Sequence, residues 1–172
     1  MAKKSKSKVS VGSYVFVGLM LAATIVGFVG LLVATHYSKA DSYTLSQLGE
    51  MFTDLNKLTD KVSTAAFTMA NIFGWVAVAG AVALVVLEAL KLFGVKVPSI
   101  ATWILVGVTL VSAAIFIVCA STVCVDICGS KDAYDLLVKS GAQLRLGAGS
   151  YMTVIGTALV PVLAVAKKLT VK

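Results

Sequence analysis

The stretch VSTAAFTMANIFGWVAVAGAVALVVL, residues 62–87, contains 26 consecutive residues without a charged side chain. Because a helix rises ~1.5 Å per residue, this stretch is long enough to cross a hydrocarbon core of ~30 Å. Three similar uncharged runs of 27, 29 and 21 residues occupy positions 9–35, 97–125 and 146–166. A chain of 172 residues would not hide four such segments in one soluble core. The sequence therefore predicts an all-α integral membrane protein, a four-transmembrane-helix bundle that forms a single domain over residues 1–172.

The spans are expected at about residues 13–35, 64–91, 98–121 and 149–166, with loops at 37–63 and 122–147. The first apolar run exceeds the ~7–15 residues of a signal-peptide core, so we expect a permanent span there. Gly94 is suited to end the second span, and Pro98 to the first turn of the third. These two helices are therefore predicted to be antiparallel neighbours.

Charge is divided unevenly between the two sides of this layout. The two tails and the connection near residue 94 hold nine lysines and one acid, Glu88, for a total of +8. The loops at 37–63 and 122–147 hold six cations and seven acids, for a total of −1, and the two totals give the net +7 of the chain. Since cytoplasmic segments carry an excess of Lys and Arg, both termini are predicted to be cytoplasmic. The basic tail then acts as a topology signal that attracts anionic membrane lipids, and we expect no nucleic acid partner.

The first loop has the pattern of a short extracytoplasmic amphipathic helix. Thr44 and Gln47 have the spacing of a capping box. Apolar residues then recur at steps of three and four over about 18 residues, at Leu45, Leu48, Met51, Leu55 and Leu58. No helix breaker precedes the second span, so the two helices are expected to form one long rod. The apolar stripe is expected either to pack on the second loop or the lipid surface, or to form an assembly seam with another subunit.

Small residues predict where the membrane helices approach closely. In the first span, small residues with helical spacing stand at Gly18, Ala22, Gly27 and Gly30, and Gly18 and Ala22 form a small-xxx-small pair. In the second span, Ala66, Ala70 and Gly74 repeat at every fourth position. Helices in lipid gain little from apolar burial against each other, so close backbone packing through small residues brings them together. The face of the first span is therefore expected to lie against a neighbouring helix. The face of the second is expected either at the centre of the bundle or against another protomer.

Two polar side chains are candidates within the membrane. Asn71 is expected to bond a hydroxyl such as that of Thr68 or Thr153, or to line a pore. Glu88 lies three residues before Lys91, which permits an ion pair, and its position near the helix end lets the side chain reach the interface. A carboxylate that couples to ion movement is the alternative interpretation of Glu88.

The second loop and its border carry the cysteines. A disulfide between Cys124 and Cys128 is plausible in an oxidising compartment, and the third thiol, Cys119, leaves intermolecular pairing open. Two cysteines without a nearby histidine give too few ligands for zinc. A small helix is expected at about residues 132–140. His36, at the outer end of the first span, is interpreted as an interfacial anchor rather than a ligand.

The sequence offers packing features in quantity and little chemistry. It has no phosphate-binding glycine loop, no metal-spaced cluster and no nucleophile–histidine–acid set, so we expect no catalysis, cofactor or metal. Its layout is similar to that of claudins, tetraspanins and MARVEL-domain proteins. The first loop lacks the Trp and Cys residues of claudins, and the chain lacks the tetraspanin CCG motif, so the layout assigns no family.

The predicted function is a non-enzymatic membrane protein that organises or assembles with itself or other membrane proteins, as a scaffold, junction-like or accessory subunit. The alternative is a subunit of an oligomeric channel or transporter. In that case Asn71, Thr68, Thr153, Thr157 and Glu88 are the candidates to line a path between subunits.

Overall fold

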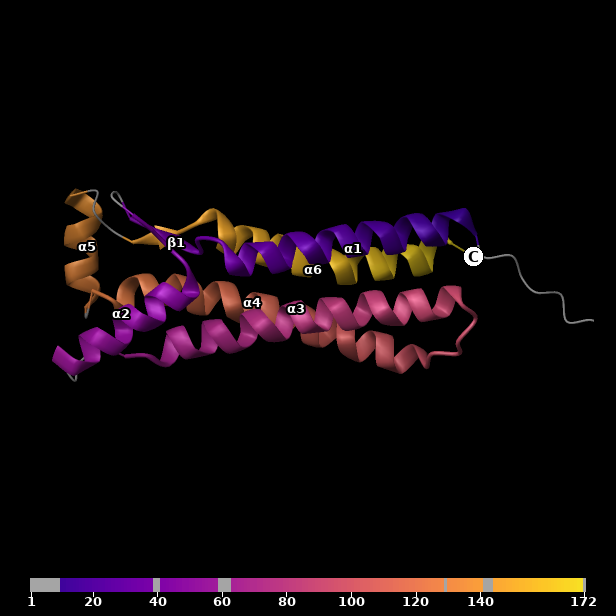
Figure 1. Ribbon diagram of the computed structural model, residues 1–172, viewed down its shortest axis with the longest axis horizontal. Coiled ribbons are helices and arrows are strands. Elements are labelled where there is room, and N and C mark those ends of the chain that lie inside the picture. Colours follow the sequence, from indigo (N-terminus) through magenta and orange to yellow (C-terminus); the bar gives the residue numbers. More distant parts are fainter. Residues whose placement is uncertain (1–9, 39–40, 59–62, 129, 141–143, 172) are drawn as a thin grey trace, which may run out of the picture.

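The computed structural model describes residues 10–38, 41–58, 63–128, 130–140 and 144–171. Four long helices run side by side along the longest axis of the molecule (Figure 1). They are α1 (Val11–Leu32), α3 (Ala65–Leu92), α4 (Ser99–Asp126) and α6 (Ala148–Thr170). Each is long and apolar enough to cross a membrane. The prediction of a helical chain with four helices long and apolar enough to span a membrane is thereby confirmed.

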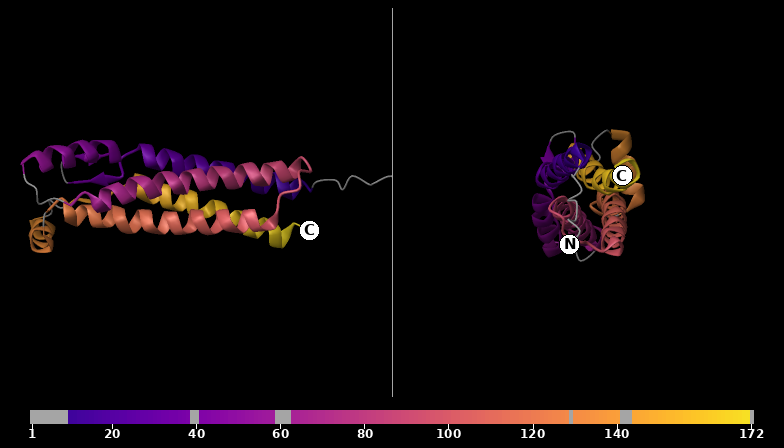
Figure 2. Two further views of the ribbon diagram at one scale, coloured as in Figure 1. Left: turned by 90° about the horizontal axis from the view of Figure 1, so that it is seen from below. Right: turned by 90° about the vertical axis from the view of Figure 1, so that its right-hand side faces the viewer.

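The helices pack as two pairs, α1 with α6 and α3 with α4, and these pairs share the most extensive contacts of the molecule. Contacts of α4 with α6 and of α1 with α3 close the bundle, as both views of Figure 2 show. Two apolar clusters fill its interior, one around Met20, Leu84 and Val160 and the other around Leu31 and Phe116. The short link between α3 and α4 makes those helices antiparallel neighbours, as predicted.

Five short elements gather at one end of the bundle, which we call the sheet end (Figure 1). They are β1 (His36–Tyr37), β2 (Ser42–Tyr43), α2 (Leu45–Leu58), α5 (Lys131–Ser140) and β3 (Arg145–Leu146). The strands form an antiparallel sheet in the order β2-β1-β3. The sequence did not predict this sheet, because strands of two residues are too short to show an alternating pattern. The opposite end, where α3 and α6 finish and α4 begins, is called the lysine end.

The predicted rod of α2 and α3 is wrong. The two residues before α3, Ser63 and Thr64, are not helical. The α2 helix folds back toward α3, so that the rings of Phe52 and Phe67 lie 5.4 Å apart. The α2 helix still opens with reciprocal capping-box hydrogen bonds, from Thr44 N to Gln47 Oε1 (2.8 Å) and from Gln47 N to Thr44 Oγ1 (3.3 Å). Folding back buries the apolar face of α2, which a projecting rod would leave in water.

The close-packing face of α1 uses the later small residues of the predicted set and not the Gly18–Ala22 pair. Gly18 and Ala22 are exposed, and a side chain at Gly18 would meet nothing within 4 Å. Gly30 provides the contact instead: a Cβ there would lie 2.5 Å from the backbone N of Thr153. Small residues do bring α1 and α6 together. In a uniformly apolar helix, however, no polar face shows which of several small-residue rows points inward.

The third membrane helix continues beyond its predicted end. We expected it to stop near residue 121, but α4 runs to Asp126 without interruption. The residues from Thr122 to Val125 contain no glycine or proline to stop it. Cys124 therefore belongs to this helix rather than to a loop, whereas Cys128 follows the helix end.

Candidate functional site

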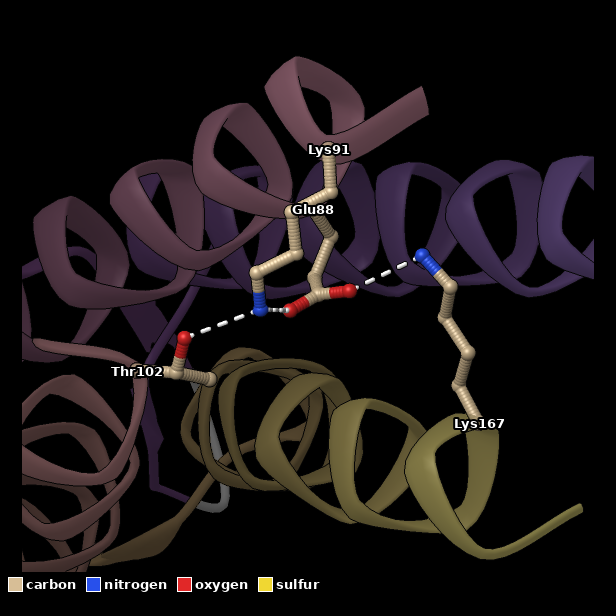
Figure 3. Close-up of polar contacts among 4 residues, drawn as sticks. All are labelled: Glu88, Lys91, Thr102 and Lys167. Atoms are coloured by element: carbon tan, nitrogen blue, oxygen red, sulfur yellow. Dashed lines mark hydrogen bonds and ion pairs between the residues drawn. The ribbon is translucent and has the colours of Figure 1, made fainter. Parts of the chain in front are cut away.

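Charged side chains from two separate helices meet at the lysine end. Glu88, in the last turns of α3, has an exposed fraction of only 4%. Its carboxylate accepts one hydrogen bond from Lys91 and another from Lys167 of α6 at 2.8 Å. Lys91 also donates to Thr102 Oγ1 of α4 at 3.0 Å. Figure 3 shows the carboxylate between the two ammonium groups, so one buried acid links three helices.

Local sequence brings these groups together. Lys91 and Lys167 lie in the last turns of α3 and α6, where the free carbonyl ends of a helix favour cations. After α3 the chain reverses at Gly94, which has a φ of +81°. The amides of Gly94 and Val95 bond back to the carbonyls of Lys91 and Leu90, a Schellman arrangement. The reversal starts α4 beside α3 and places Thr102 against Lys91.

The sequence predicted part of this cluster. The Glu88–Lys91 pair is confirmed. The Glu88 side chain is buried between two ammonium partners, and its expected reach to the membrane interface stays a prediction. Lys167 was missed as a partner. A signal was present in the charge count: Glu88 is the only acid among the lysines of this side, so any lysine that packs inward there has only Glu88 to pair with.

The sheet end has a different polar centre, built on His36. This side chain is fully buried, with Nε2 2.9 Å from the Ala120 carbonyl and Nδ1 3.1 Å from Thr35 Oγ1. Since a carbonyl only accepts, Nε2 carries the proton and donates to Ala120. In the neutral ring Nδ1 then accepts from the Thr35 hydroxyl, whose other partner is the more distant Tyr43 carbonyl at 3.5 Å. Burial lowers the pKa of His36 from its ordinary value of 6.5. The predicted interfacial anchor is therefore wrong, because the ring is a neutral cross-link between β1 and α4.

Backbone contacts join both loops beside this histidine. The amide of Gly147 and the hydroxyl of Ser150 each donate to the Thr35 carbonyl at 2.7 Å. The amide of Gly149 donates to the Ala34 carbonyl at 3.0 Å. A Cβ on Gly147 would lie 2.7 Å from that same Ala34 oxygen. Glycine at this position is required by the space available, so the sheet end is a tightly fitted unit.

The apolar stripe of α2 is largely used inside the chain. Leu45 and Leu48 are buried. Leu48 packs with Val123 and Cys124 of α4. The side chains of Met51 and Leu55 are partly buried, and that of Leu58 lies outside the described part of the chain. The second loop contributes Leu144 and Tyr134 to the same cluster, as the intramolecular interpretation of the stripe expected.

The two intramembrane candidates do not meet. Asn71 is half-buried and lines a pocket of about 460 Å³ together with Trp75 and residues of α2. Its expected hydroxyl partners are engaged elsewhere or exposed: Thr153 donates to the Gly149 carbonyl at 2.8 Å, and Thr68 is exposed. Asn71 therefore lies toward the sheet end and Glu88 at the lysine end, on the same helix.

The three thiols are free in this structure. Cys124 is buried, and Cys128 donates its thiol hydrogen to the Cys124 carbonyl at 3.5 Å. Burial raises the pKa of Cys128, which lowers its thiolate fraction and its reactivity. The Cys124–Cys128 disulfide remains a prediction. Among the described residues, no three His, Cys, Asp or Glu side chains are grouped so as to hold a metal ion.

Comparisons of the chain with protein-family models, with curated proteins and with solved structures find no match.

Proposed function

We propose that this protein is a non-enzymatic four-span membrane protein that assembles with copies of itself. In this proposal the lysine end is cytoplasmic, and the sheet end, with α2 and α5, is outside the cytoplasm. The four apolar helices support insertion in a membrane. The orientation is supported by the division of charge, +8 on one side and −1 on the other.

The observation that carries the assembly proposal is the unused face of α5. None of its residues is buried, and in Figure 1 it lies across the long axis of the bundle at the tip of the sheet end. Leu136 has an exposed fraction of 67%, and Leu137 and Val138 are also exposed. Three consecutive exposed apolar residues outside the membrane helices are a favourable place for protein contact.

The charges of α5 favour a second copy as the occupant. Asp132 and Lys139 are both exposed and lie near opposite ends of the helix. In an antiparallel pair related by a two-fold axis, Asp132 of each copy would lie opposite Lys139 of the other. Leu136 would then lie close to the axis. The helix is self-complementary, as a two-fold interface requires.

The polar interior supports packing rather than conduction. Buried hydroxyls in the bundle bond to carbonyls of their own helices: Thr24 to Met20, Thr109 to Leu105 and Thr157 to Thr153. Groups satisfied in this way do not offer a continuous polar path. The channel alternative would place its path between copies rather than within one chain.

The molecular mass in mild detergent, from light scattering corrected for bound detergent, tests the proposal. We expect twice the 17.8 kDa of one chain. Lys139→Glu should give monomers, because two acids then face each other, and the added change Asp132→Lys should restore the dimer. A wild type that is monomeric in both detergent and nanodiscs would contradict self-assembly.

Two controls separate the proposal from its alternatives. Leu48→Glu should unfold the monomer rather than dissociate the dimer, because Leu48 is buried within one chain. Ion flux through liposomes that contain the wild type should equal that of empty liposomes. Flux that Asn71→Leu abolishes would overturn the proposal in favour of the channel subunit.

A further inference from the structure

A pocket of about 360 Å³ opens at the lysine end, between the ends of all four long helices. One part of its wall is polar and includes Glu88, Lys91, Thr102, Lys167 and Lys168. The remainder is apolar, with Leu92, Val106 and Ala164 among its members. A pocket with both kinds of wall fits a ligand that has a polar head and an apolar body.

The polar part carries more positive than negative charge. Three ammonium groups line it, and Glu88, the one carboxylate among its lining residues, is already bonded to Lys91 and Lys167. The third, Lys168, lies over the Trp103 ring with Nζ 4.9 Å from the ring centroid. No carboxylate of the described residues forms an ion pair with Lys168. The pocket therefore has the electrostatic capacity for another anion.

Two further donors point to a ligand at this place. Ser13 of α1 lines the pocket with an exposed fraction of 7% for the whole residue. Its hydroxyl is not a buried unpaired group, and as part of the pocket wall it can donate a hydrogen bond to an anionic oxygen. The first turn of α4 begins at Ser99, also in the pocket wall, and its N-cap residue Pro98 supplies no side-chain acceptor. Free amides at a helix start favour an anionic oxygen.

The surroundings place this pocket where lipid is the available ligand. Beside it, Ile100 and Ile104 of α4 are strongly exposed, as expected for side chains that face hydrocarbon. Trp103 lies between them in sequence, and tryptophan concentrates at the level of lipid headgroups. An anion at Lys168 would therefore lie at headgroup level, with the apolar wall of the pocket below it.

We infer that the pocket binds the phosphate of an anionic membrane lipid. Lys168, Lys91 and the Ser13 hydroxyl contact the phosphate oxygens, and part of an acyl chain covers Val106 and Ala164. Glu88 keeps Lys91 and Lys167 fixed at the rim and is not itself a ligand for the phosphate. This site does not depend on the dimer proposed above, because none of its residues belongs to α5.

Native mass spectrometry of the full chain, released from detergent after incubation with defined lipids, tests the inference. Phosphatidylglycerol should remain bound at one molecule per chain, and zwitterionic phosphatidylcholine should not. Lys168→Gln should weaken phosphatidylglycerol binding about fivefold, the effect of one lysine near an anionic lipid. Adding Ser13→Ala to this variant should weaken the binding further. Lys96→Gln is the matched control, since Lys96 is exposed in the same region but does not line the pocket.

Soluble phosphates distinguish the possible sources of the anion. Inorganic phosphate and glycerophosphate, at millimolar concentration, should not displace the lipid. Displacement by either would overturn the lipid assignment and leave a site for free phosphate. Equal retention of the two lipids, or an equal loss in Lys96→Gln and Lys168→Gln, would overturn the site itself. Unchanged thermal unfolding midpoints would show that the variants remain folded.

Discussion

The two ends of the bundle hold the same four helices together by different means. At the sheet end the contacts are made by backbone amides and carbonyls, by glycines without room for a methyl group, and by one neutral histidine. At the lysine end they are made by long charged side chains around a pocket of about 360 Å³. Backbone contacts allow one geometry, whereas lysine side chains adjust and leave space. We therefore expect the sheet end to be sensitive to size and the lysine end to charge.

The largest effect should come from adding one methyl group at the sheet end. A Cβ on Gly149 would lie 2.6 Å from the Gly30 carbonyl oxygen and 2.7 Å from that of Ala34, and both are backbone atoms that cannot rotate away. Gly149→Ala should therefore lower the free energy of unfolding by about 3 kcal/mol, the upper part of the usual cost of overpacking. Reversible unfolding in mixed micelles measures this.

Gly107→Ala is the matched control for that substitution. Gly107 lies on α4 toward the lysine end, and a Cβ there would meet nothing within 4 Å. Its stability should be unchanged or slightly raised, since alanine favours helix over glycine. Equal destabilisation by the two substitutions would contradict the size argument, because only one site lacks space.

The next effect should come from removing one charge at the lysine end. Glu88→Gln leaves Lys167 inside the bundle without its carboxylate, which should cost about 3 kcal/mol, the lower end for a broken buried pair. The double change Glu88→Leu with Lys167→Met should recover most of this loss, because neither buried charge remains. Both are measured by the same unfolding assay.

An exposed ion pair at the sheet end provides the comparison. Asp54 and Lys57 also have i,i+3 spacing and an N–O distance of 2.9 Å, but both side chains are about 70% exposed, at 72% and 70%. Asp54→Asn should therefore change stability by less than about 0.5 kcal/mol. If Glu88→Gln changed the free energy of unfolding as little as Asp54→Asn does, the burial of the Glu88 ion pairs would contribute nothing to stability.

The sequence was sufficient for the four long apolar helices, because uninterrupted hydrophobic length is visible in the sequence itself. It was also sufficient for the Glu88–Lys91 pair and the capping box of Thr44 and Gln47, since their partners lie three residues apart. Local spacing is visible in a sequence without any knowledge of the fold.

The remaining contacts depend on distant residues. Lys167 meets Glu88 across 79 positions, and His36 meets Ala120 across 84. Gly18 and Gly30 were equally good small-residue candidates, and only the position of α6 decides between them. The rod of α2 and α3 was wrong for a related reason: helix propensity favours continuation, whereas the apolar stripe gains more by folding back onto Val123.

The last comparison between the two ends depends on pH. Burial lowers the pKa of His36 below its ordinary value of 6.5, so the folded chain keeps this ring neutral while the unfolded chain takes up a proton as the pH falls. The unfolded state then binds more protons, and stability must decrease as the pH falls below about 6.5. The free energy of unfolding should therefore fall between about pH 7.5 and 5.5. His36→Gln, which can still donate to Ala120 but does not titrate, should lack this part of the pH dependence. The free energy of unfolding of both proteins is measured over this range. Equal slopes would mean that His36 takes up its proton at the same pH in the folded and the unfolded chain, which would contradict a buried ring with a lowered pKa.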